Sequence, residues 1–163
     1  MSHEVLETCI KLLKAEIRDS IAQGKYKNVV QKATALLVMY TGARPSEASY
    51  AICNIKDTYG ECGSILGIQD DKTDKAFTVP AKYTKTKSEY KFYLSPNDGG
   101  IFYDGILKDM KIATDKGFDW QTVSHSVNYT IAAFSARACK LLKHKTCECS
   151  QYNPKSVRRY RAT

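Results

Sequence analysis

An arginine at a predicted turn between two helices is the first candidate for chemistry in this sequence. Arg44 lies in the segment Thr41–Glu47, TGARPSE, where Gly42 allows a tight reversal and Pro45 suits the first position of a new helix. An arginine at a helix start can bind a phosphate through two parallel hydrogen bonds. The alternative is a surface arginine paired with Glu47, which would fall in the first helical turn, where the helix dipole favours an acid.

A lysine-rich turn between two predicted strands is the second candidate. Residues 81–88, AKYTKTKS, contain Lys82, Lys85 and Lys87. A lysine at the tip of a hairpin can reach a DNA groove or donate a proton to a leaving oxygen. Lysine-rich turns also serve simply to keep strand edges soluble, so the pattern alone leaves both interpretations open.

The third candidate is a basic helix at the end of the sequence, KSVRRYRAT. Lys155 and Arg158 are three residues apart and therefore share one helical face, close to a helix N-terminus that itself favours an anion. Arg159 and Arg161 point elsewhere and could contact flanking phosphates. The alternative is a basic helix without particular chemistry.

The distribution of charge favours a polyanionic partner. The net charge is +8, and residues 137–163 hold eight Lys and Arg against one acid, whereas residues 1–136 carry a net charge of only +1. Clustered lysine and arginine side chains bind nucleic acid because each phosphate contact releases counterions. A solvated basic tail would give the same distribution.

Local sequence patterns predict the elements that carry these residues. Apolar residues at helical spacing, with stop signals at Gly24 and Gly42, indicate helices, and three short runs rich in β-branched and aromatic residues indicate strands. We expect helices over about residues 5–21, 29–40, 102–113 and 126–142, helices that begin at Pro45 and at Pro154 after an Asn153 N-cap, and strands over 64–69, 76–84 and 89–95. The predicted fold class is α+β: one mainly helical domain over residues 1–163 with a small three-stranded antiparallel sheet.

Taken in order, the three candidate segments resemble the catalytic domain of tyrosine recombinases, the phage-type integrases. LLVMYTGARPSEASYAICNI is similar to the first conserved box of that family, with Thr-Gly-x-Arg between two helices and a glutamate three residues after the arginine. The turn at Lys85-Thr86 resembles the hairpin that carries the family's catalytic lysine. KSVRRYRAT resembles the second box, H-x-x-R-H-T-F-A-T, at Arg158, Ala162 and Thr163. The resemblance runs from about residue 25 to residue 163.

The resemblance implies a catalytic set of Arg44, Lys85, Lys155 and Arg158, with Glu47 in support. Lys82, Lys87, Arg159 and Arg161 would contact DNA outside that set, and Lys87 is an alternative to Lys85 as the proton donor. The reaction would break and rejoin DNA through a 3′-phosphotyrosine, and we expect neither a metal nor a cofactor.

Two departures from the family pattern qualify this expectation. Lys155 stands where the second box usually has a histidine, although some relatives, including telomere resolvases and type IB topoisomerases, also have lysine there. The family's nucleophilic tyrosine follows the second box, so we assign that role to no tyrosine of residues 1–163. We also expect no separate DNA-clamping domain before the catalytic domain.

Two other functions remain open at this point: a truncated or catalytically silent DNA-binding module of the same fold, and an unrelated basic nucleic-acid-binding protein. The expected partner is double-stranded DNA, with further copies of the chain possible on it and no membrane. The first residues lack the character of a signal peptide. We therefore expect an intracellular protein, nuclear if eukaryotic and otherwise in the cytoplasm or nucleoid, with its six cysteines reduced. A zinc site at Cys139, His144, Cys147 and Cys149 is the weaker alternative, because the spacing fits no standard finger.

Overall fold

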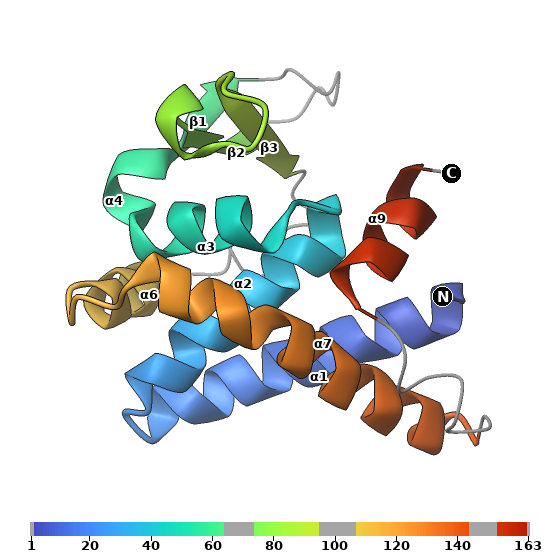
Figure 1. Cartoon of the computed structure of the whole chain (residues 1–163). Helices are drawn as coiled ribbons and strands as arrows, with labels where there is room; N and C mark the ends of the chain where they lie inside the picture. Colours follow the sequence, from blue (N-terminus) through green and yellow to red (C-terminus); the bar gives the residue numbers. More distant parts are fainter. Residues whose placement is uncertain (1, 64–73, 95–106, 144–152, 163) are drawn as a thin grey trace.

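The computed structural model describes residues 2–63, 74–94, 107–143 and 153–162, which form a helical bundle with a small sheet at one end (Figure 1). Helix α1, His3–Ala22, begins where the Ser2 hydroxyl oxygen accepts a hydrogen bond from the Val5 N–H at 3.3 Å. Its apolar stripe is buried, as the sequence predicts, and packs against α2 and α7. The prediction of an amphipathic first helix is confirmed.

Helix α2, Tyr26–Thr41, is the centre of the bundle. It contacts α1, α3, α6, α7 and α9, and its residues 33–39 are buried on every side. A helix that is covered all round must be apolar all round, which explains the run ATALLVM. The helix ends at Gly42, whose φ of 71° is left-handed and whose N–H donates to the Val38 carbonyl at 2.8 Å. The stop predicted at Gly42 is therefore confirmed.

Helix α3, Pro45–Cys53, begins three residues after Gly42, with Arg44 as its N-cap residue and Pro45 at its first position. The short helix α4, Ile55–Thr58, continues directly into the sheet. The buried face of α3 packs on α7 and α2. Arg44 is thus fixed at the junction of two helices that both belong to the core.

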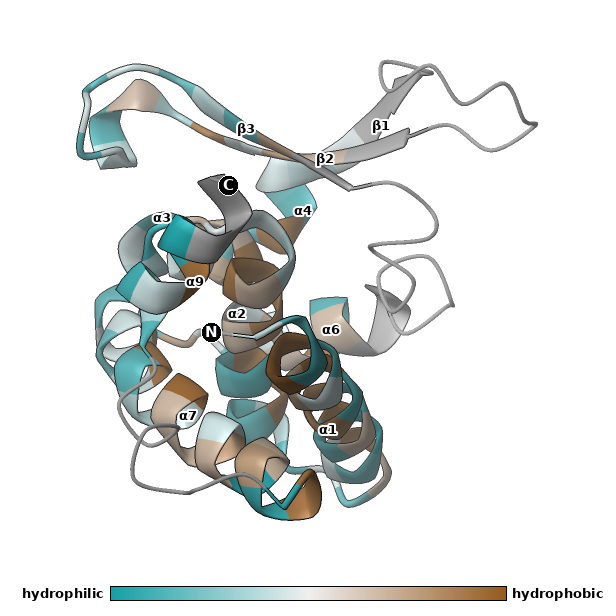
Figure 2. Cartoon of the chain, turned by 90° about the vertical axis from the view of Figure 1, so that its right-hand side faces the viewer, coloured by the Kyte–Doolittle hydropathy of each residue, from teal (hydrophilic) through white to brown (hydrophobic). Residues whose placement is uncertain are grey.

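The sheet has the order β1-β2-β3 and is antiparallel throughout, with strands Tyr59–Gly63, Asp74–Val79 and Tyr90–Leu94. Phe77 pairs with Tyr59 on one side and Phe92 on the other, and it is fully buried. The sheet lies over α3 and α4 as a layer of its own (Figure 2). The α+β class and the three-stranded sheet are confirmed.

The strand boundaries differ from those predicted. β1 covers 59–63, whereas the predicted first strand, 64–69, lies outside the described residues. β2 ends at Val79 instead of reaching Thr84, because Pro80 has no N–H to donate and a 3-10 helix, η1 (Ala81–Tyr83), follows it.

Three further helices complete the described fold. α6 covers Leu107–Thr114, α7 covers Trp120–Leu141, and α9 covers Pro154–Ala162. α7 begins six residues before the predicted start, since the Asp119 carboxylate accepts a hydrogen bond from the Thr122 N–H at 3.2 Å and caps the helix. Part of the predicted helix 102–113 lies outside the described residues.

The described residues bear on two expectations, that the cysteines are reduced and that the chain has no membrane partner. Cys9 and Cys53 are free thiols, but Cys139 is disulfide-bonded, so the expectation of reduced cysteines is wrong there. His144, Cys147 and Cys149 lie outside the described residues. Within the described part of the chain, none of the helices combines the length and apolarity required to cross a bilayer.

Candidate nucleic-acid interface

The turn that carries Arg44 is held by side-chain hydrogen bonds as well as by glycine. The Thr41 hydroxyl donates to the Leu37 carbonyl at 2.7 Å and accepts from the Ala43 N–H at 3.2 Å. The hydroxyl therefore ties the last turn of α2 to the residue before Arg44. This fixes the direction in which the backbone enters α3, and it leaves the Arg44 side chain 30% exposed.

Glu47 connects the Arg44 turn to the hairpin. One oxygen of its carboxylate, Oε1, lies 3.7 Å from Arg44 Nη1 and accepts a hydrogen bond from the Lys85 N–H at 3.3 Å. The Arg44–Glu47 pair considered from the sequence is therefore present, with its carboxylate buried (2% exposed) and its guanidinium partly exposed (30%). A buried carboxylate needs such partners, because burial without them is costly. Glu47 thereby links two segments that are 38 residues apart.

The hairpin turn is stabilised around the buried Thr84. The Thr84 hydroxyl hydrogen-bonds to the Ser88 carbonyl at 2.7 Å and the Ala81 carbonyl at 3.2 Å. The backbone then passes through a left-handed conformation at Lys87, where φ is 60°. These hydrogen bonds define the turn that carries the lysines of the hairpin.

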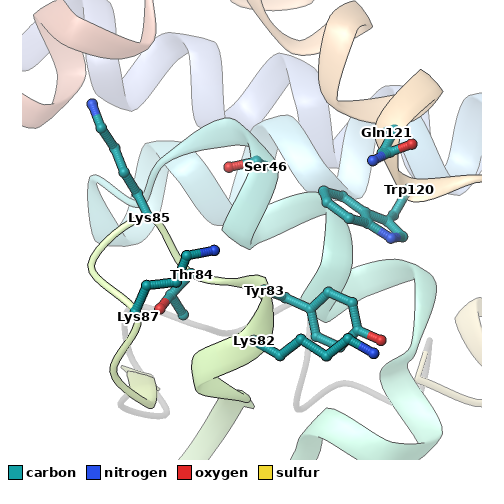
Figure 3. A pocket seen from close by; sticks show the side chains of 8 residues that line it. All are labelled: Ser46, Lys82, Tyr83, Thr84, Lys85, Lys87, Trp120 and Gln121. Atoms are coloured by element: carbon teal, nitrogen blue, oxygen red, sulfur yellow. The ribbon is translucent and has the colours of Figure 1, made fainter.

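The three lysines of this turn, Lys82, Lys85 and Lys87, are all exposed. Lys85 extends out of the hairpin, away from the other labelled side chains (Figure 3). Its N–H is bound by Glu47 while its side chain is exposed, an arrangement suited to an approaching phosphate.

The basic C-terminal helix is anchored by one apolar residue. Val157 is fully buried, Arg158 is half-buried, and Lys155 and Arg159 are exposed. The Asn153 side-chain oxygen accepts the Ser156 N–H at 3.1 Å, which confirms the predicted N-cap. The side chain of Arg161 lies outside the described part of the structure.

The basic helix α9 lies close to the junction of α2 and α3, where Arg44 is the N-cap residue of α3. α9 packs against α2 and α7, and it lies beside the junction of α2 and α3 in both views (Figures 1 and 2). Among the described residues, however, no hydrogen bond or ion pair joins Arg158 to Arg44 or Glu47. Arg44 and the backbone of Lys85 are thus joined through Glu47, whereas Arg158 and Lys155 belong to a helix beside the α2–α3 junction and have no direct link to that pair.

An aromatic cluster beside the hairpin was not predicted from the sequence. Tyr50 and Tyr83 stack with ring centroids 4.1 Å apart, and Trp120 makes edge contacts with both, at 5.8 and 6.1 Å. Burial, with smaller contributions from Tyr83 and Asp57, raises the pKa of Tyr50. The three rings come from α3, η1 and α7, so no local pattern brings them together. The N-capping sequence DWQT could have indicated that Trp120 begins a helix.

A pocket of about 470 Å³ opens between the hairpin turn and the start of α7 (Figure 3). Its walls include Tyr83 and Trp120, together with the three hairpin lysines. In the described part of the chain, no group of three or more His, Cys, Asp or Glu side chains could hold a metal ion.

The sequence matches no protein-family model, and no curated protein or solved structure gives a significant match to the chain.

Proposed function

We propose that this chain binds double-stranded DNA as the catalytic-domain portion of a tyrosine recombinase. The observation that carries the proposal is the Glu47 carboxylate, which holds Arg44 at 3.7 Å and the Lys85 N–H at 3.3 Å through one oxygen. The arginine of the first box and the lysine of the hairpin are the two residues that the family resemblance requires near one phosphate. Support also comes from α9, the helix that contains Lys155 and Arg158, because it packs against α2 and lies beside the junction of α2 and α3.

In the proposed reaction, a tyrosine oxygen attacks a DNA phosphorus, and the bond from phosphorus to the 5′ oxygen breaks. Arg44 and Arg158 would bind the non-bridging oxygens and stabilise the charge that develops on the pentacoordinate phosphorus. Lys85 or Lys87 would give a proton to the departing 5′ oxygen. Lys155 would add positive charge.

A second candidate function, a module that binds DNA without cutting it, is favoured by the state of the tyrosines near the hairpin. Tyr50 and Tyr83 are stacked on each other, and burial raises the pKa of Tyr50, which disfavours a reactive phenolate. Arg44 and Lys85 would then serve only to contact phosphates, and Glu47 to hold the two segments together.

Both candidate functions include binding to duplex DNA, and the dependence of duplex affinity on salt concentration tests that shared claim. Four to eight phosphate contacts predict that the logarithm of the binding constant falls with the logarithm of salt concentration with a slope of about −4 to −7. Replacing Arg158 with Ala should reduce the slope by about 1 on unrelated sequences, since phosphate contacts carry no base information.

Fluorescence anisotropy with labelled duplexes gives these slopes, and Arg18→Ala on the exposed surface of α1 is the matched control. Binding that does not change with salt, or an Arg158→Ala variant that behaves like Arg18→Ala, would contradict the proposal.

A further inference from the structure

The pocket beside the hairpin combines an aromatic wall with a cationic one. Trp120 and Gln121, the first residues of α7, lie on one side, and Lys87 lies on the other, with Tyr83 and Lys82 below them in the view of Figure 3, while the Lys85 side chain points away from the pocket. The volume of about 470 Å³ is in the range of sites for small organic ligands. The two walls match a ligand that has a flat ring and a negative charge.

The geometry of the aromatic cluster makes Trp120 the available stacking surface. Tyr50 already covers Tyr83, with ring centroids 4.1 Å apart and ring planes inclined by 19°. The indole stands at 81° to both rings and at nearly equal distances from them, so it lies beside the stack rather than on top of it. Edge contacts with the Tyr50–Tyr83 pair fix the orientation of the indole, and the half-buried Trp120 also lines the pocket. A planar ligand can stack on it without displacing a tyrosine.

The lysines supply the charge complement. Lys82 and Lys87 are exposed, and Lys82 Nζ lies 5.3 Å from the centre of the Tyr83 ring, which keeps the ammonium group at the pocket rim. The Gln121 side chain can both donate and accept hydrogen bonds, as the edge of a nucleobase does. A nucleotide provides a planar base, a polar base edge and a phosphate in one unit.

We propose that this pocket binds an unpaired nucleotide of DNA, with the base stacked on Trp120 and the adjoining phosphates bound by Lys82 and Lys87. An unpaired base is required because both faces of a paired base are covered by its neighbours in the duplex. The inference rests on the proposed function, since Lys85 belongs to both this pocket and the Arg44–Glu47 cluster. The pocket would hold a base displaced beside the phosphate that the cluster binds.

Trp120 is the only tryptophan in the chain, so intrinsic tryptophan fluorescence reports on this pocket alone. The protein is titrated with an oligothymidylate of roughly eight nucleotides and with an abasic deoxyribose-phosphate chain of equal length. Stacking should quench the fluorescence with the oligothymidylate and not with the abasic chain. Because this comparison uses the unmodified protein, it does not depend on the folding of any variant.

Anisotropy with a labelled oligothymidylate then separates stacking from general charge attraction. Trp120→Ala should weaken binding roughly tenfold and leave the affinity for fully paired duplex nearly unchanged. Tyr129→Ala, which removes an aromatic ring that is 80% exposed on the same helix, should change neither affinity.

The outcomes distinguish this inference from the proposed function. Salt-dependent duplex binding without quenching by the oligothymidylate would overturn the nucleotide pocket and leave the duplex-binding proposal standing. Quenching by the oligothymidylate without duplex binding would support the pocket and contradict the proposed function. Tighter binding of an RNA of the same length than of the oligothymidylate would overturn the assignment to DNA.

Discussion

Removing the Glu47 carboxylate should destabilise the protein by about 2 kcal/mol. The ion pair with the partly exposed Arg44 contributes about 0.5 to 1 kcal/mol, since solvent screens it. The hydrogen bond from the Lys85 N–H contributes about 1 kcal/mol more, because its acceptor is charged but its length is 3.3 Å. For a chain of this size, the sum corresponds to a decrease in Tm of about 4 to 8 °C for Glu47→Ala.

Glu47→Gln separates the contribution of the ion pair with Arg44 from that of the hydrogen bond with the Lys85 N–H. The amide oxygen can still accept the Lys85 N–H, whereas the ion pair with Arg44 is lost, so the destabilisation should be only about 0.5 to 1 kcal/mol. The same change leaves the Arg44 charge uncompensated, and duplex affinity at low salt should therefore equal or exceed that of the unmodified protein.

Thermal unfolding followed by circular dichroism measures both variants, with Glu7→Ala on the exposed face of α1 as the control for loss of a carboxylate. The reasoning is refuted if Glu47→Ala and Glu7→Ala have the same Tm. It is also refuted if Glu47→Gln is as destabilised as Glu47→Ala, because the Lys85 hydrogen bond would then contribute nothing.

Three further predictions concern the turn, the thiols and the reaction. Gly42→Ala should lower stability by about 1 kcal/mol, since alanine is strained at a φ of 71°, and urea unfolding would show no change if that turn were relaxed. Burial raises the pKa of Cys9 to about 11 and that of Cys53 to about 12, so the unfolded chain loses these protons at lower pH than the folded chain, and the free energy of unfolding should decline as pH rises above 9. For Cys53→Ala, the free energy of unfolding in urea should decline less steeply between pH 8 and 11. Equal slopes for the variant and the unmodified protein would contradict the assignment. Incubated with a nicked suicide duplex, residues 1–163 should form no covalent adduct on a denaturing gel, and an adduct would show that one of their tyrosines is the nucleophile.

Local signals in the sequence were sufficient for most helix boundaries. Gly42 ends α2 because its left-handed conformation suits glycine, and Pro45 and the Asn153 cap start α3 and α9 through interactions within a few residues. The start of α7 was missed because residues 120–125 contain a single buried apolar residue, Val123, and so lack helical periodicity.

Contacts between distant segments could not be predicted in the same way. Glu47 was expected in the first turn of its helix, but its hydrogen bond to Lys85 depends on how the hairpin folds over α3. The aromatic cluster beside the hairpin combines Tyr50, Tyr83 and Trp120 from three separate elements, and no periodicity relates them. Sequence order suggested the basic residues of the site, whereas the contacts of the buried Glu47 and the aromatic cluster emerged only from packing.

A crystal structure of the chain bound to a DNA duplex would test the central claim most directly. We predict that one backbone phosphate lies within hydrogen-bonding distance, about 2.7 to 3.2 Å, of the guanidinium groups of both Arg44 and Arg158, with Lys85 beside it. A duplex seated instead on the basic surface of Arg137, Lys140 and Lys143, with no phosphate between Arg44 and Arg158, would contradict the account.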